Sequence, residues 1–136
     1  MYIKLFEEFE YNALDNILNI ATDEGLTVKR IPYKDGVAIF IYRFVLDGYG
    51  HIQHDVLTDT YQPIVDNDQF LQIVRDVHDR FVNEDIIDKR EDNNNTLKHF
   101  LQISVNGDTG GVPIEYDLDS IDADINILHA RFLIKN

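Results

Sequence analysis

The stretch that most constrains the fold is residues 37–46, Val-Ala-Ile-Phe-Ile-Tyr-Arg-Phe-Val-Leu. Nine of these ten residues are apolar or aromatic, and because Val, Ile, Phe and Tyr favour an extended backbone, the run predicts a β-strand. Asp35-Gly36 before it and Asp47-Gly48 after it are typical of tight turns, in which glycine accepts a positive φ angle. Side chains of a strand alternate between its two faces, so a run that is apolar at both parities is covered on both faces or lies at the centre of a sheet. We therefore expect residues 37–46 to form the central strand.

Two amphipathic helices are predicted, one before this strand in the sequence and one after it. In residues 3–24 apolar side chains recur every three or four positions, and Gly25 stands where a left-handed C-terminal cap is expected. The second helix begins after Asp66, a typical N-cap residue with Gln69 three positions later, and continues to about Asn83. Residues 85–96 are highly polar, which predicts an extension of this helix that ends in a loop.

The remaining strands are predicted from apolar patterns at 26–31, 51–57, 97–105, 112–116 and 125–135. Pro32 cannot donate to a neighbouring strand and should end the first of them, after which Lys34-Asp35-Gly36 should turn the chain into an antiparallel hairpin. The last strand is apolar at both parities except at His129 and Arg131, so it too should lie inside the sheet. The element order α-β-β-β-α-β-(β)-β favours an α+β fold, an antiparallel sheet of about five strands with two helices packed on one face.

Length and composition predict a single domain, residues 1–136, because 136 residues with 44% apolar content suit one core. No stretch approaches the roughly 20 consecutive apolar residues that span a bilayer, and the charged N-terminus does not fit a cleaved signal peptide. The absence of cysteine excludes disulfides, thiolate nucleophiles and cysteine-ligated metal sites, and it is typical of a reducing compartment. We expect a cytoplasmic protein with no membrane partner.

The formal net charge is −13, from 25 acidic residues against 12 Lys and Arg residues. A field of this sign repels phosphate backbones, and the sequence shows no local basic patch, so we expect no direct contact with nucleic acid. No Lys or Arg occurs between Lys98 and Arg131, where the acidic residues are densest. The candidate partner-binding residues of this stretch are Glu115, Asp117, Asp119, Asp122 and Asp124. They indicate either a docking surface for a protein with a basic surface or a solvated loop that aids solubility.

The sequence offers little material for catalysis. Ser104 and Ser120 are the only serines, and neither lies in a Gly-x-Ser-x-Gly turn, which argues against a serine hydrolase. His99 and His129 are predicted on strands, as neutral core histidines or alternatively as a catalytic base or ligand, and pairing of their strands could make them cross-strand neighbours. The four aspartates of the acidic stretch offer oxygen ligands for Ca²⁺ or Mg²⁺ but lack the glycine and glutamate of an EF-hand loop. Metal binding stays open, and no cofactor is expected.

Residues 1–10, Met-Tyr-Ile-Lys-Leu-Phe-Glu-Glu-Phe-Glu, resemble the short leader at the start of proteins from T-even-type tailed bacteriophages, including their internal head proteins. In that family the leader directs the protein into the assembling head. It is removed by the phage's prohead protease, after a glutamate preceded two residues earlier by Leu or Ile. Leu5-Phe6-Glu7 matches this pattern, whereas Glu10 matches the usual leader length but has Glu8 where Leu or Ile is expected. The same residues also begin the apolar stripe of the first predicted helix.

These features predict a small, acidic, non-enzymatic accessory protein of phage type that binds a protein partner and inhibits a host nucleic-acid-binding or defence protein. Its place would be the host cytoplasm or the virion. One alternative is a structural component of the virion or of head assembly, which would form a homo-oligomer through an edge such as residues 51–57. Another is a divalent-metal-dependent enzyme that uses the acidic stretch with His99 or His129.

Overall fold

The computed structural model describes residues 14–46, 49, 54–55, 60–61, 63–91, 95, 97–105 and 127–135, with the backbone alone for 54–55, 60–61 and 104–105. These residues form a helix over 14–22 and then, in chain order, β1 (Thr27–Tyr33), β2 (Gly36–Tyr42), β3 (His54–Asp55), β4 (Thr60–Tyr61), α2 (Asn67–Asn83), β5 (Lys89–Glu91), β6 (Leu97–His99), β7 (Leu101–Val105) and β8 (Ile127–Lys135). The first part of the helix predicted over 3–24, most of the strand predicted at 51–57 and the whole strand predicted at 112–116 lie outside the described residues.

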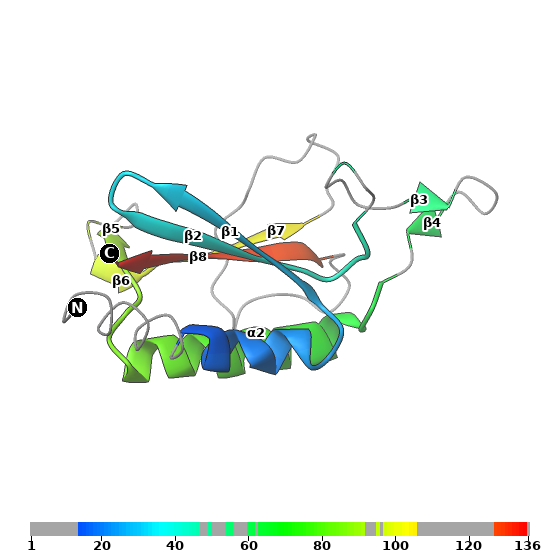
Figure 1. The fold of residues 1–136 in the computed structure, drawn as a ribbon, viewed down its shortest axis with the longest axis horizontal. Coiled ribbons are helices and arrows are strands. Elements are labelled where there is room, and N and C mark those ends of the chain that lie inside the picture. Colours follow the sequence, from blue (N-terminus) through cyan, green and yellow to red (C-terminus); the bar gives the residue numbers. More distant parts are fainter. Residues whose placement is uncertain are drawn as a thin grey trace, which may run out of the picture.

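The fold has two layers, with the helices on one face of an antiparallel sheet (Figure 1). The main sheet has four strands in the order β1-β2-β8-β7, and each neighbouring pair is antiparallel. The short pairs β3–β4 and β5–β6 form separate two-stranded sheets. The predicted α+β class with two helices on one face is confirmed, and the main sheet has four strands where about five were expected.

The hairpin predicted at the start of the sheet is confirmed. β1 pairs with β2 from Thr27 opposite Tyr42 to Tyr33 opposite Gly36, with Lys34-Asp35 as the turn. However, β1 continues through Pro32, contrary to the prediction that proline ends it. β1 is an edge strand of the main sheet, and an edge tolerates a residue that lacks an N–H donor.

β2 is an inner strand, as predicted, but it ends at Tyr42 and not at residue 46. The backbone of the next residue, Arg43, still donates to the carbonyl oxygen of Leu128 at 3.0 Å, but its own carbonyl oxygen accepts from the N–H of Ile64 at 2.7 Å. The Arg43 side chain is buried, and its Nε donates to the carbonyl oxygen of Ile127 at 2.6 Å and its Nη1 to that of Val65 at 3.2 Å. The strand therefore ends at the point where Arg43 forms hydrogen bonds both with β8 and with the segment before α2.

α2 begins and ends where the sequence predicts. The carboxylate of Asp66 caps its first turn by accepting the N–H of Gln69 at 2.8 Å, and the last helical residue is Asn83. The predicted helical extension over 85–96 is wrong. Asp85 has a φ of 53°, and the N–H of Ile86 donates to the carbonyl oxygen of Phe81 at 3.2 Å, which is the Schellman cap that ends a helix. The polar pattern conceals this end because an aspartate occupies the left-handed position that glycine usually takes.

The helix over 14–22 has the same kind of end, which confirms the predicted cap at Gly25. Gly25 has a φ of 84°, and the N–H of Leu26 donates to the carbonyl oxygen of Ala21 at 3.2 Å. Each half of the main sheet therefore follows a capped helix: the first helix precedes β1 and β2, and α2 precedes β7 and β8. The two halves meet where β2 pairs with β8.

The predicted last strand is confirmed as β8, whereas the strand predicted over 97–105 is interrupted. The N–H of Phe100 donates to the carbonyl oxygen of Asp88 at 2.8 Å, and the N–H of Asp88 donates to that of Leu133 at 2.7 Å. Ile87, just before β5, therefore pairs with Ile134 near the end of β8, and β7 pairs with the earlier residues of β8, from Ile127 to Phe132. The interruption separates β6 from β7 at Phe100.

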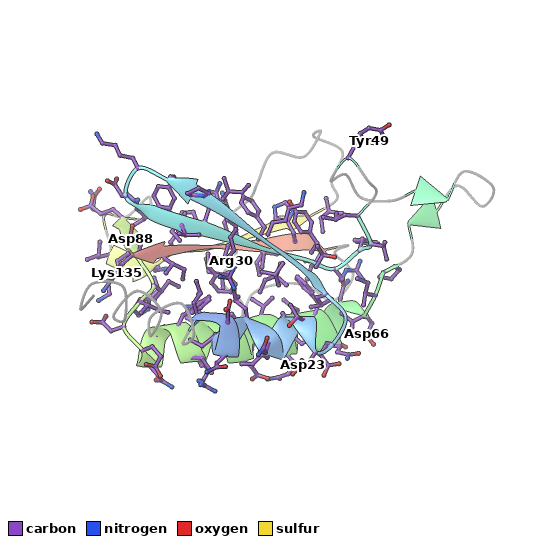
Figure 2. The ribbon with its side chains drawn as sticks, viewed as in Figure 1. Asp23, Arg30, Tyr49, Asp66, Asp88 and Lys135 are labelled. Carbon is purple, nitrogen blue, oxygen red and sulfur yellow. The ribbon has the colours of Figure 1, made fainter. Side chains whose placement is uncertain are left out.

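The hydrophobic core lies between the sheet and the helices. The ring of Phe81 on α2 meets the ring of Phe132 on β8 edge to face, with centroids 5.2 Å apart. The fully buried aromatic and aliphatic side chains of this layer include Ile17, Ile39, Ile41, Phe70, Val74, Val77, Ile103 and Ile127. Arg30 of β1 points from the sheet toward the helices and forms an ion pair with Asp15 (Figure 2).

Candidate functional site

The face of the main sheet opposite the helices carries aromatic and cationic side chains. Because Phe132 packs against α2 and strand side chains alternate, its neighbour Arg131 belongs to the opposite face. The register places Phe40 opposite Arg131 and Tyr42 opposite His129. We define the sheet-face cluster as Lys29, Phe40, Tyr42, Phe100, His129 and Arg131, all of which are partly exposed.

A β-bulge positions His129 in this cluster. Ser104 is opposite His129, but the next residue of β7, Val105, is opposite Ile127, so Leu128 is the extra residue. In a regular strand Ile127 and His129 would share a face. The bulge turns Ile127 into the core, where it is fully buried, and leaves His129 on the face opposite the helices.

The side chains of the cluster contact one another. The Phe40 ring stacks on the Tyr42 ring at 6.3 Å between centroids, and the His129 ring lies 5.6 Å from Phe40 and 5.1 Å from Tyr42. The Arg131 guanidinium lies 5.1 Å from the centroid of Phe100 and 6.0 Å from that of Phe40. Lys29 Nζ lies 5.7 Å from the centroid of Tyr42. Each cation is therefore positioned by the face of an aromatic ring.

Burial sets the charge state of the aromatic part of the cluster. It lowers the pKa of His129 to about 4, and the positive charge of Arg131 acts in the same direction. Burial also raises the pKa of Tyr42, so both side chains are uncharged at neutral pH. The cluster therefore presents two cations, Lys29 and Arg131, beside uncharged rings.

Arg131 has no carboxylate partner in the described part of the chain, unlike Arg30 and Arg90. Arg30 pairs with Asp15, and Arg90 Nη2 lies 3.0 Å from a carboxylate oxygen of Asp88. Arg131 contacts two aromatic rings, and its buried Nε has no hydrogen-bond acceptor. A guanidinium that contacts aromatic rings and has no carboxylate partner can donate hydrogen bonds from its Nη groups to an external anion.

The predicted partner-binding residues Glu115, Asp117, Asp119, Asp122 and Asp124 lie outside the described residues. What the structure does show is where their segment is attached. Val105 and Ile127 are opposite each other in β7 and β8, so the 21 residues between them leave and re-enter the main sheet at adjacent positions. This segment contains six acidic residues and no Lys or Arg.

His99 and His129, which pairing of their strands could have made neighbours, are not opposite each other. His129 is opposite Tyr42 and Ser104, whereas His99 is opposite Lys89 in the β5–β6 pair. The neighbour of His99 is His78 of α2, at 5.9 Å between ring centroids, and burial together with His99 lowers the pKa of His78. Among the described residues no three His, Asp or Glu side chains come together to hold a metal ion.

Comparison with known proteins gives no assignment: no family model matches the chain, and neither the curated proteins nor the solved structures contain a significant match. Within the described ranges, no helix has the length and apolar character needed to cross a membrane.

The sequence predictions missed the sheet-face cluster, although its signal is present in the two inner strands. His129 and Arg131 are the polar exceptions of an apolar strand, two positions apart, and Phe40 and Tyr42 show the same spacing. Because the side chains of a strand alternate between its two faces, residues two positions apart lie on the same face. The register that brings the two pairs together is a property of the folded sheet.

Proposed function

We propose that the protein is a small, acidic, non-enzymatic accessory protein that acts by binding another protein with a basic surface. The observation that supports this is the distribution of charge along the chain. The 32 residues between Lys98 and Arg131 contain six acidic residues and no Lys or Arg, in a chain that has 25 acidic residues against 12 Lys and Arg residues.

All six of these acidic residues belong to the segment between Val105 and Ile127. Because β7 and β8 attach both of its ends at one place in the sheet, a partner that contacts the segment is held beside the folded body. Concentrated negative charge speeds the encounter with a basic surface and selects against acidic ones. The residues proposed for this contact are Glu115, Asp117, Asp119, Asp122 and Asp124.

The resemblance of residues 1–10 to the leader of T-even-type phage proteins supports a phage-type protein that acts in an infected cell. In that setting, the proposed partner is a host protein whose basic surface binds nucleic acid or serves in defence. An acidic protein that occupies such a surface would inhibit its partner by competing with the phosphate backbone.

The experiment is an affinity pull-down from bacterial host lysate, eluted with a salt gradient and analysed by mass spectrometry. We expect a stoichiometric host protein that is released as salt screens the contact. A variant with Asp117, Asp119, Asp122 and Asp124 changed to Asn should release it at much lower salt.

The matched control neutralises four exposed acidic residues of the helix layer, which changes the net charge equally: Asp23, Asp76, Asp79 and Glu84. We expect this control to retain the partner nearly as well as the wild-type protein does. The proposal is refuted if both variants weaken retention equally, because net charge and not the acidic segment would then govern binding.

A further inference from the structure

The sheet-face cluster has a chemistry opposite to that of the acidic segment. We propose that it binds a short peptide segment of the partner protein in which a carboxylate side chain stands next to an aromatic or aliphatic side chain. This inference rests on the proposed function in one respect, that the partner is a protein, and it assigns a second docking surface to that interaction.

The carboxylate is matched to Arg131. The centre of this guanidinium lies 5.1 Å from the ring centroid of Phe100 and 6.0 Å from that of Phe40, and these aromatic contacts occupy none of its N–H groups as hydrogen-bond donors to a carboxylate. A carboxylate accepts two parallel hydrogen bonds from the edge of a guanidinium. Since no carboxylate of the described residues pairs with Arg131, an external one would supply the missing charge partner.

The apolar side chain is matched to the rings and to the surface beside them. Phe40, Tyr42 and His129 form one continuous aromatic surface, and His129 stays uncharged at neutral pH. On the same face of β1, two positions from Lys29, Ile31 is 49% exposed, a large fraction for an isoleucine.

The number of cations decides between a peptide and a nucleic acid. A strand of nucleic acid gains affinity in proportion to the phosphates it neutralises, typically about 6–10 of them in a strong complex. The cluster contributes two cations, and the net charge of −13 repels a polyanion from a distance. A peptide with one or two carboxylates and an adjacent ring needs no more cations than the cluster contains.

The test measures fluorescence anisotropy of a fluorescein-labelled hexapeptide, Gly-Asp-Phe-Glu-Leu-Gly, titrated with the full chain. We expect saturable binding that is lost with the amide analogue Gly-Asn-Phe-Gln-Leu-Gly. Arg131→Gln should weaken binding about tenfold or more, the effect of removing a charged hydrogen-bond donor. Arg131→Lys keeps the charge without the planar fork and should weaken it as well.

The matched control is Arg80→Gln, which removes one exposed arginine from α2 in the opposite layer and should leave the affinity unchanged. Circular dichroism of each variant establishes that it is folded. If Arg131→Gln does not fold, Phe40→Leu tests the aromatic surface in its place. Equal affinity of the wild-type protein, Arg131→Gln and Phe40→Leu overturns the inference. Tighter, Arg131-dependent binding of a ten-nucleotide oligo(dT) also overturns it, in favour of nucleic acid.

The pull-down separates this inference from the proposed function. If the wild-type protein retains a host protein and Arg131→Gln retains it as strongly, the sheet-face inference fails and the proposed function stands. If neither the wild-type protein nor the variants retain a protein while the hexapeptide binds, the proposed function fails and the peptide site stands.

Discussion

Replacing His129 with phenylalanine should make the stability of the protein less sensitive to acid. Burial between Phe40 and Tyr42 and the positive charge of Arg131 hold the pKa of His129 at about 4 in the folded state, against 6.5 for an exposed histidine. As pH falls below 6.5, the unfolded chain binds a proton at this position that the folded protein does not. The free energy of unfolding is therefore unaffected by this group above pH 6.5 and decreases progressively as the pH falls from 6.5 toward 4.

The size of the effect follows from the difference between the two pKa values. At about 1.36 kcal/mol for each pKa unit, the wild-type protein should lose roughly 2 kcal/mol of unfolding free energy at pH 5 from this group. At pH 4 the loss reaches at most about 3 kcal/mol. A phenylalanine ring preserves the aromatic contacts with Phe40 and Tyr42 and cannot titrate, so His129→Phe should lack this loss.

The assay is urea denaturation followed by circular dichroism at pH 7, 6, 5 and 4 for the wild-type protein and His129→Phe. The difference in unfolding free energy between the two proteins isolates His129, since all other titrating groups are common to both. We expect this difference to change in favour of His129→Phe by roughly 2 kcal/mol between pH 7 and 5. A difference that is constant with pH would show that His129 is as accessible to protons in the folded protein as in the unfolded chain.

Three further substitutions test the fold. Arg43→Met should lower the unfolding free energy by roughly 1–3 kcal/mol in urea melts, because two buried carbonyl groups lose a charged donor; unchanged stability would show that neither carbonyl needs it. Gly36→Ala should destabilise by roughly 1–3 kcal/mol or more, since the new methyl group would collide with the carbonyl oxygen of Ile134; an unchanged thermal midpoint would contradict the register of β2 and β8. Asp85→Gly should raise the Tm by roughly 2–4 °C, because glycine adopts the left-handed conformation at lower cost and the exposed contact with Lys135 contributes little; a lower Tm would show that this contact outweighs backbone strain.

Features that depend on neighbouring residues were predictable from the sequence. The cap of α2 at Asp66, the cap at Gly25 and the turn at Lys34-Asp35 each follow from residue types within a few positions, and all are present in the structure. The errors arise where a distant segment decides the outcome. β2 ends at Tyr42 because Arg43 pairs with Ile64, and the strand over 97–105 breaks because Asp88 takes a place beside β8.

The candidate site could be predicted only in part for the same reason. The spacing of Phe40 with Tyr42, and of His129 with Arg131, places each pair on one face of its strand. Which strands are neighbours, and the bulge that separates His129 from Ile127, depend on pairing across the sheet. The apolar content of residues 37–46 predicted either cover on both faces or a place at the centre of the sheet, and β2 is an inner strand of the main sheet.

The position of β8 has a consequence for synthesis of the protein. β8 is the last described strand in the chain, yet it lies between β2 and β7, and its partners in β2 are 87 to 99 residues earlier. Until β8 has emerged from the ribosome, the inner edge of β2 has no strand to pair with and its apolar residues have no complete core. Assembly therefore waits for a contact between distant parts of the chain, which slows folding and exposes an aggregation-prone edge in any shortened product. An interrupted or prematurely terminated chain should thus be recognised by chaperones and proteases as unfinished.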